Sequence, residues 1–241
     1  MLLNVHHQLS DGLKIGCLLT GAGEKERPAI LLLSEIFGVN EAMAQAAEAL
    51  ASAGYAVLAP DLYGRIAPGT SLLYSPEERE LALALWAGLD PAQSLHDVGQ
   101  LAALLRQMDG CDGRVAAVGF CLGGQLALLA ALEKMVDAAV AFYPVKVMEY
   151  AARLPWLERP VQVHVGDRDQ HLPPELMRAL EAGLAGLKDS EFRVYEGADH
   201  GFYNAVRSFG LHPRHAASAH QAMIGFLDAH LPQLAASTLS R

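Results

Sequence analysis

Residues 115–128, VAAVGFCLGGQLAL, decide the fold. The segment begins as a run of small and β-branched apolar residues, which is typical of a strand buried on both faces. The run ends at Gly119, and an Ala/Leu-rich helical pattern starts directly after Cys121. Gly119 and Gly123 lack Cβ atoms where the strand and the helix come nearly into contact. The segment therefore predicts a strand, a very tight turn and a helix, with a thiol at the apex.

The thiol of Cys121 stands where a nucleophile is well presented. The pattern GFCLG at 119–123 matches the G-x-S-x-G turn, with Cys in place of the nucleophilic Ser. The helix that follows would place unpaired N–H groups and the positive end of its dipole beneath the sulfur. Both favour a thiolate and a developing oxyanion, so Cys121 is a candidate nucleophile.

Strands alternate with helices along the chain, which predicts right-handed crossovers and a mostly parallel, doubly wound α/β sheet. Residues 10–12, Ser-Asp-Gly, predict a hairpin that adds an antiparallel edge at the N-terminus. We expect one domain over residues 1–241, with 231–241 as a loose tail. The expected strands are 3–9, 13–19, 28–34, 55–60, 114–119, 137–143, 160–166 and 191–195, and the expected helices are 41–53, 76–88, 92–108, 122–133, 146–153, 173–187 and 213–230.

Composition excludes several classes of protein. The 241 residues, 52% hydrophobic, suffice for a large buried core. The net charge of −9 argues against binding a nucleic-acid backbone, and no apolar run is long enough to span a membrane. Residues 1–20 lack a signal-peptide pattern, and three cysteines suit a reducing compartment. We therefore expect a cytoplasmic protein in which Cys17 and Cys111 are inert thiols.

Three loops that follow expected core strands carry reactive side chains, and such loops meet at the carboxyl edge of the sheet, where ligands bind. Cys121 follows the expected strand 114–119, Asp167 and Asp169 follow the expected strand 160–166, and His200 follows the expected strand 191–195. The order nucleophile, acid, histidine is that of α/β-hydrolases. The imidazole would act as base and the acid would fix its tautomer. The spacing of Gly166 and Pro173 favours Asp169 as the acid, whereas Asp167 would either cap the turn or stay solvated.

Glu35 directly follows a fully apolar strand, where a charge is costly unless it is used or paired. It is either a solvated loop acid or a group that interacts with Cys121. The backbone N–H of Ile36, together with that of Leu122, would form an oxyanion hole.

Five segments together resemble the dienelactone hydrolase family. They are LSEIFG at 33–38, PDLYGR at 60–65, APGT at 67–70, GFCLGG at 119–124 and HGF at 200–202. The resemblance covers about residues 5–230 and implies an α/β-hydrolase fold, a Cys121–His200–Asp169 triad and acyl transfer on an ester or lactone. It also implies a resting thiol that is held by Glu35 until substrate binds.

The substrate-binding positions depart from the family pattern. Where related enzymes use one Tyr and two Arg, this sequence has Leu83, Arg79 and Asn204. Asn cannot replace a bidentate guanidinium contact with a carboxylate, so we expect a more neutral or larger ester or lactone. Further expected pocket walls are Phe37, Tyr143, Phe202 and Tyr203.

Other chemistries lack a motif. His212, His215 and His220 do not have the spacing of a metal site, and no nucleotide-binding glycine pattern occurs, so we expect no metal and no cofactor. The expected partner is a small-molecule ester or lactone, and the expected state is a monomer. The alternative from a different class is a non-catalytic binding protein on the α/β-hydrolase fold. A thioesterase or peptidase using the same residues is a third reading.

Overall fold

The computed structural model describes residues 2–207 and 212–232. One sheet joins eight strands: β1 (Val5–Gln8), β2 (Lys14–Thr20), β3 (Arg27–Leu33), β4 (Ala56–Pro60), β5 (Cys111–Phe120), β6 (Ala138–Phe142), β7 (Val161–Gly166) and β8 (Glu191–Tyr195). The helices are α1 (Glu41–Ser52), α2 (Pro76–Ala87), α3 (Pro91–Arg106), α4 (Leu122–Leu132), α5 (Pro174–Leu184) and α6 (Pro213–His230). Two short 3₁₀ helices, η1 (Val147–Glu149) and η2 (Ala151–Trp156), follow β6.

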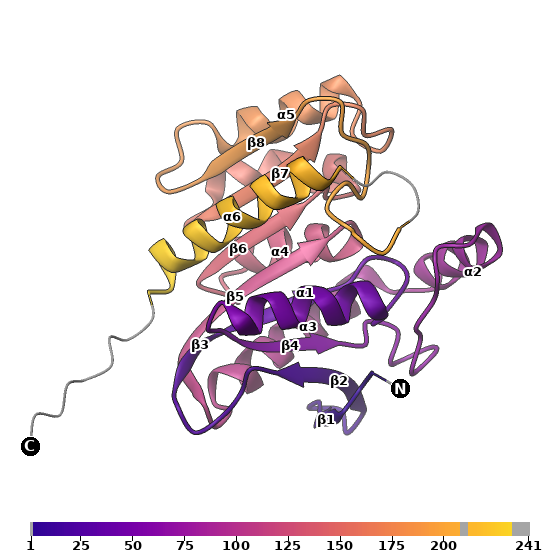
Figure 1. The fold of residues 1–241 in the computed structure, drawn as a ribbon, viewed down its shortest axis with the longest axis vertical. Helices are drawn as coiled ribbons and strands as arrows, with labels where there is room; N and C mark the ends of the chain where they lie inside the picture. The colour runs from indigo at the N-terminus through magenta and orange to yellow at the C-terminus, as the bar shows by residue number, and fades with distance from the viewer. Residues whose placement is uncertain (1, 208–211, 233–241) are drawn as a thin grey trace, which may run out of the picture.

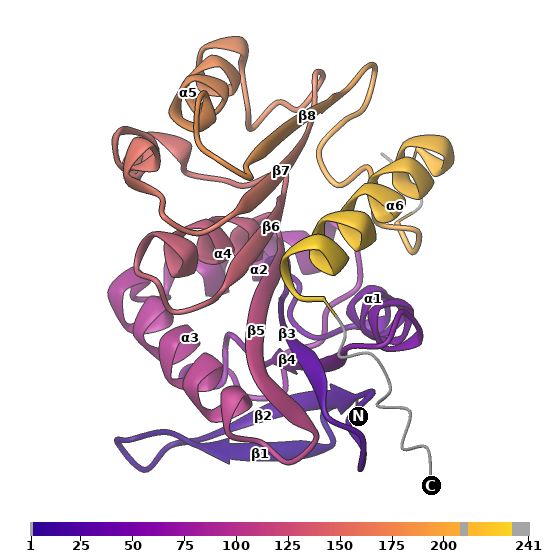
Figure 2. The same ribbon diagram turned by 90° about the vertical axis from the view of Figure 1, so that its left-hand side faces the viewer.

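The strand order is β1-β2-β4-β3-β5-β6-β7-β8. Strands β3 to β8 pair in parallel, while β1 and β2 form the antiparallel edge. Helices α1 and α6 cover one face of the sheet, and α3, α4 and α5 cover the other (Figures 1 and 2). The predicted α/β-hydrolase fold with an antiparallel N-terminal edge is therefore confirmed.

Continuous apolar runs in the sequence correspond to strands that are buried on both faces. Every residue of β4, β6 and β7 is buried. Because helices cover both faces of these central strands, no polar alternation is needed. The reactive loops therefore extend from a rigid frame.

Several boundaries differ from the expected ones. Strand β5 begins at Cys111 rather than 114, because Arg27 pairs with Cys111 across an irregular step in the ladder. The expected helix at 146–153 is replaced by η1 and η2, which are separated at Tyr150 and contain Pro155. Leu231 is buried, so the tail does not begin there, and residues 233–241 lie outside the described part.

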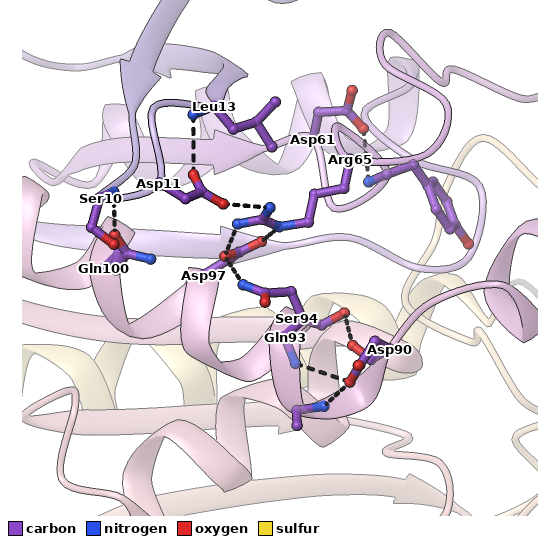
Figure 3. A network of polar contacts seen from close by, with 12 residues as sticks. Ser10, Asp11, Leu13, Asp61, Arg65, Asp90, Gln93, Ser94, Asp97 and Gln100 are labelled. Atoms are coloured by element: carbon purple, nitrogen blue, oxygen red, sulfur yellow. Dashed lines mark hydrogen bonds and ion pairs between the residues drawn. The ribbon is translucent and has the colours of Figure 1, made fainter.

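Arg65 ties the β1–β2 turn to α3 below the carboxyl edge of the sheet (Figure 3). Its guanidinium donates to both carboxylate oxygens of Asp97 and, over 2.7 Å, to Asp11. Asp61 caps the neighbouring turn by accepting from the N–H groups of Tyr63 and Gly69. Bidentate charge-assisted bonds fix orientation as well as distance, so the loop after β4 is held in one arrangement.

Two glycines allow the β5–α4 turn to pack backbone against backbone. A Cβ atom on Gly119 would lie 2.0 Å from the Gly123 carbonyl oxygen, and one on Gly123 would lie 2.1 Å from the Leu33 carbonyl oxygen. Cys121 itself has a φ of 55°, a conformation that is costly for a residue with a side chain. Its N–H donates to the Phe142 carbonyl over 3.0 Å, which stabilises this conformation.

We predict that Gly123→Ala lowers the free energy of unfolding by more than about 3 kcal/mol, because the Leu33 carbonyl belongs to the central sheet and cannot move away. Gly225→Ala in α6 is the matched control, since a Cβ there would meet no atom within 4 Å. That control should raise stability by up to about 1 kcal/mol, the helix-propensity difference. Urea titration of both variants measures the two effects, and equal, small changes would contradict this reading of the turn.

Candidate active site

Asp169 and His200 are joined at the carboxyl edge of the sheet. His200 Nδ1 lies 2.7 Å from Asp169 Oδ2, and the other carboxylate oxygen accepts the His171 N–H over 2.8 Å. Asp167 instead accepts the Gly197 N–H over 2.6 Å and is exposed. The structure therefore places Asp169, and not Asp167, in contact with the imidazole, with Asp167 capping the turn.

Cys121 lies beside the imidazole in the same cavity. Because Nδ1 of His200 is engaged by Asp169, the other ring nitrogen is the one available to the sulfur. Burial lowers the pKa of His200, but the negative charge of a Cys121 thiolate and the hydrogen bond with Asp169 outweigh burial and raise that pKa to about 10. The site therefore favours the imidazolium form of His200.

The other two cysteines have different surroundings. Burial raises the pKa of Cys17 to about 12, with the charge of Asp61 adding to the effect, and burial also raises the pKa of Cys111. Both thiols stay protonated at neutral pH and are poor nucleophiles. The three cysteines are all free.

Glu35 is buried, with 5% of its surface exposed. Its Oε1 accepts the Tyr143 hydroxyl over 3.1 Å, and its Oε2 accepts from the Asn204 side chain over 3.2 Å. Burial, followed by the negative charge of Glu35, raises the pKa of Tyr143 well above its ordinary value, so the tyrosine stays a donor. The carboxylate is thus held by Tyr143 and Asn204, and the expected hydrogen bond to the Cys121 thiol is not among its contacts within the described residues.

The two expected oxyanion donors lie in the loops that surround Cys121. Ile36 lines the cavity, and the peptide that carries its N–H is held through the Glu35 carbonyl, which accepts the Gly38 N–H over 3.3 Å. The Gly123 N–H is donated to the Ser34 carbonyl over 3.0 Å. The Leu122 N–H is therefore the first one of α4 that can face an oxygen above the sulfur.

The cavity at Cys121 and His200 has a volume of about 640 Å³. Three expected substrate-binding residues line it, namely Phe37, Arg79 and Leu83. Sequence reasoning missed the following further lining residues: Trp86, Val145, Arg168, Gln170, His171, Asp199 and Arg207. The cavity is therefore richer in guanidinium groups than the sequence suggested.

Four expected pocket residues lie elsewhere. Phe202 is fully buried among the rings of Tyr143 and Tyr195 and lines neither cavity described here. Tyr143, Tyr203 and Asn204 line a second cavity, which Glu35 also lines. For the residues that follow His200, the reason is the turn at Gly201, which has a φ of 81° and redirects the chain.

Arg207 reaches the cavity in place of Asn204. Its Nη1 donates to the His200 carbonyl over 3.2 Å, which brings the guanidinium next to the imidazole. Arg168 lies between Asp167 and Asp169 in the loop after β7. Its position directly after the carboxyl end of a strand could have indicated that it lines the cavity. Arg207 lies seven residues beyond His200, and only the path of the loop reveals its role.

Within residues 2–207 and 212–232, no group of three His, Cys, Asp or Glu residues could hold a metal ion.

Residues 15–231 match the model of the dienelactone hydrolase family. The chain belongs to this family. It is 34% identical over 221 residues to a carboxymethylenebutenolidase of Pseudomonas putida, covering 91% of this chain and 93% of that protein. It is 33% identical over 196 residues to carboxymethylenebutenolidase 1 of Cupriavidus pinatubonensis, covering 78% and 84%.

Solved structures agree with this assignment. A crystal structure from Klebsiella pneumoniae is described as that of a candidate dienelactone hydrolase. It superposes with a TM-score of 0.80 at 26% identity, covering 92% of this chain and 96% of that one. A dienelactone hydrolase-like promiscuous phosphotriesterase from metagenomic libraries has a TM-score of 0.76 at 20% identity, covering 94% and 96%, and shows the shared fold. The family and its relatives confirm the expected enzyme class, a hydrolase of ester or lactone bonds.

In the described part of the chain, no helix is both long and apolar enough to cross a membrane.

We predict that His200 stays protonated well above pH 7 in the parent protein and titrates at lower pH in Cys121→Ser, which removes the thiolate. Because the pKa of folded His200, about 10, exceeds its ordinary value of 6.5, its contribution to stability is complete below pH 6.5 and is lost as pH rises towards 10. NMR titration of the imidazole carbons measures both pKa values. Titration of parental His200 near 6.5 would contradict the ion pair.

Proposed function

We propose that this protein hydrolyses esters or lactones by covalent catalysis, with Cys121 as nucleophile, His200 as acid and base, and Asp169 as the group that orients His200. The observation that carries the proposal is the hydrogen-bonded Asp169–His200 pair beside a thiol on a strained turn at the N-terminus of α4. Such a set is recognised by geometry and roles rather than by sequence position.

The proposed reaction has two halves. The Cys121 thiolate attacks the carbonyl carbon, and the negative charge that develops on oxygen is stabilised by the N–H groups of Ile36 and Leu122. Collapse of this intermediate breaks the ester C–O bond, and the leaving alkoxide takes a proton from His200. The resulting thioester is then attacked by water, whose proton passes to His200, and the carboxylic acid and the thiolate are released.

The proposed substrate carries a negative charge close to the reacting carbonyl. Arg79, Arg168 and Arg207 all line the cavity, and guanidinium groups bind carboxylates in a bidentate manner. The relatives named carboxymethylenebutenolidase agree with a carboxylate-bearing lactone. This revises the neutral substrate expected from Asn204, because the sequence did not reveal that Arg168 and Arg207 enter the cavity.

The alternative is a binding protein without turnover, and nothing in the cavity favours it over an enzyme.

A monomeric state and a cytoplasmic location remain our predictions, and size-exclusion chromatography with light scattering would test the first of them.

We predict that Cys121→Ala abolishes ester hydrolysis and that Asp169→Asn lowers kcat by roughly 10²–10⁴, because the imidazole loses the partner that fixes its tautomer. Cys17→Ala is the matched control and should keep parental rates. Steady-state kinetics with an aryl ester measures these effects. Parental turnover in Cys121→Ala would exclude the cysteine mechanism.

We also predict that Arg79→Gln raises KM for a carboxylate-bearing ester about tenfold or more, while KM for a neutral ester of the same size changes little, because only the charged substrate loses an ionic contact. Arg178→Gln on the exposed side of α5 is the control and should affect neither substrate. Equal changes for both esters would show that Arg79 does not recognise charge.

A further inference from the structure

A second cavity, of about 220 Å³, lies between α1 and α6. These two helices lie on the same face of the sheet (Figures 1 and 2). Glu35 lines both this cavity and the one that holds Cys121. We call the second cavity the α1–α6 cleft. Nothing in the proposed reaction uses it.

The walls of the α1–α6 cleft are apolar. Ala42, Ala46 and Ala49 recur on one side of α1, and their short side chains leave the volume open. Phe120 and Tyr203 stack with ring centroids 5.2 Å apart and also line the cleft. Apolar walls with a few polar groups are typical of sites for small molecules. A cavity of about 150 Å³ is enough for benzene, so the cleft has room for one substituted ring or a short chain.

The inner end of the cleft is polar. Glu35 accepts one hydrogen bond at each oxygen, from Tyr143 and Asn204. Because an ionised carboxylate offers about four acceptor sites, lone pairs remain for a donor on a ligand. The negative charge of Glu35 opposes a second carboxylate at the same place.

His220 adds a neutral group to the lining. Its Nδ1 lies 2.8 Å from the Tyr203 hydroxyl, and burial lowers the pKa of His220. The ring is therefore uncharged at neutral pH and offers no attraction to an anion. Together with Glu35, it disfavours an anion, and the apolar walls make a charged ligand of either sign costly to bury.

We infer that the α1–α6 cleft binds a small neutral molecule, one ring or a short aliphatic chain that carries a hydroxyl group, with the hydroxyl donated to Glu35. A ligand hydroxyl would share the carboxylate with Tyr143 and Asn204, using a lone pair that they leave open. Since Glu35 also lines the cavity of Cys121, an occupied cleft changes the surroundings of the thiol. Occupancy of the two cavities is therefore coupled, and the coupling is reciprocal.

Binding is tested with 4-methylphenol and, as the charged counterpart, 4-methylbenzoate, using ligand-observed NMR. The phenol should bind and the benzoate should not. Ala46→Phe fills the cleft and should weaken binding of the phenol about tenfold or more, since close-packed walls leave no room for both rings. Ala44→Phe, on another side of α1, is the matched control and should bind as the parent does. Thermal unfolding verifies that both variants are folded.

The location and the coupling are tested with iodoacetamide. Protein that is already alkylated at Cys121 should still bind the phenol. In the parent, the phenol should change the alkylation rate of Cys121, and the phenol concentration that gives half of this change should equal the one that half-saturates binding. Neither readout depends on ester turnover, so a failure here is distinct from a failure of the proposed function. Unchanged binding in Ala46→Phe, loss of binding after alkylation, or an alkylation rate that does not respond to the phenol would overturn the inference.

Discussion

Backbone packs directly against backbone where β5 turns into α4, and the position of each reactive group depends on this contact. Gly119 and Gly123 permit it, and the Leu33 and Phe142 strands flank it on either side. The contact places Cys121 in a strained conformation at the carboxyl edge of the sheet, on the first turn of a helix. A strained conformation at a single non-glycine residue persists only where several surrounding contacts impose it. Here the contacts with the central strands impose the conformation of Cys121.

Charge then separates the roles of two buried carboxylates near Cys121. Asp169 lies against His200 and favours the imidazolium, whereas Glu35 is held by two neutral donors, Tyr143 and Asn204. Glu35 is within the wall that divides the reactive cavity from the α1–α6 cleft. The same residue therefore faces both cavities.

Much of the fold was predictable because local chemistry and tertiary packing agree. Continuous apolar runs gave the buried strands, and Asn40 marked the start of α1, where its side chain accepts from the Ala42 and Met43 N–H groups. The order of Cys121, Asp169 and His200 predicted which loops meet, because parallel strands end at one edge. Expectations about substrate residues were less accurate. The path of the loop after His200 excludes Phe202 and Asn204 from the reactive cavity and brings in Arg207, and no pattern of residue types specifies that path.

The central claim is that Cys121 carries the acyl group during hydrolysis. Rapid mixing with 4-nitrophenyl acetate, acid quenching and peptide mass spectrometry tests it most directly. We expect an acetyl thioester on Cys121 that forms at least as fast as turnover, with Cys17 and Cys111 unmodified. Turnover without an acetylated Cys121, or an adduct that forms more slowly than product, would contradict it.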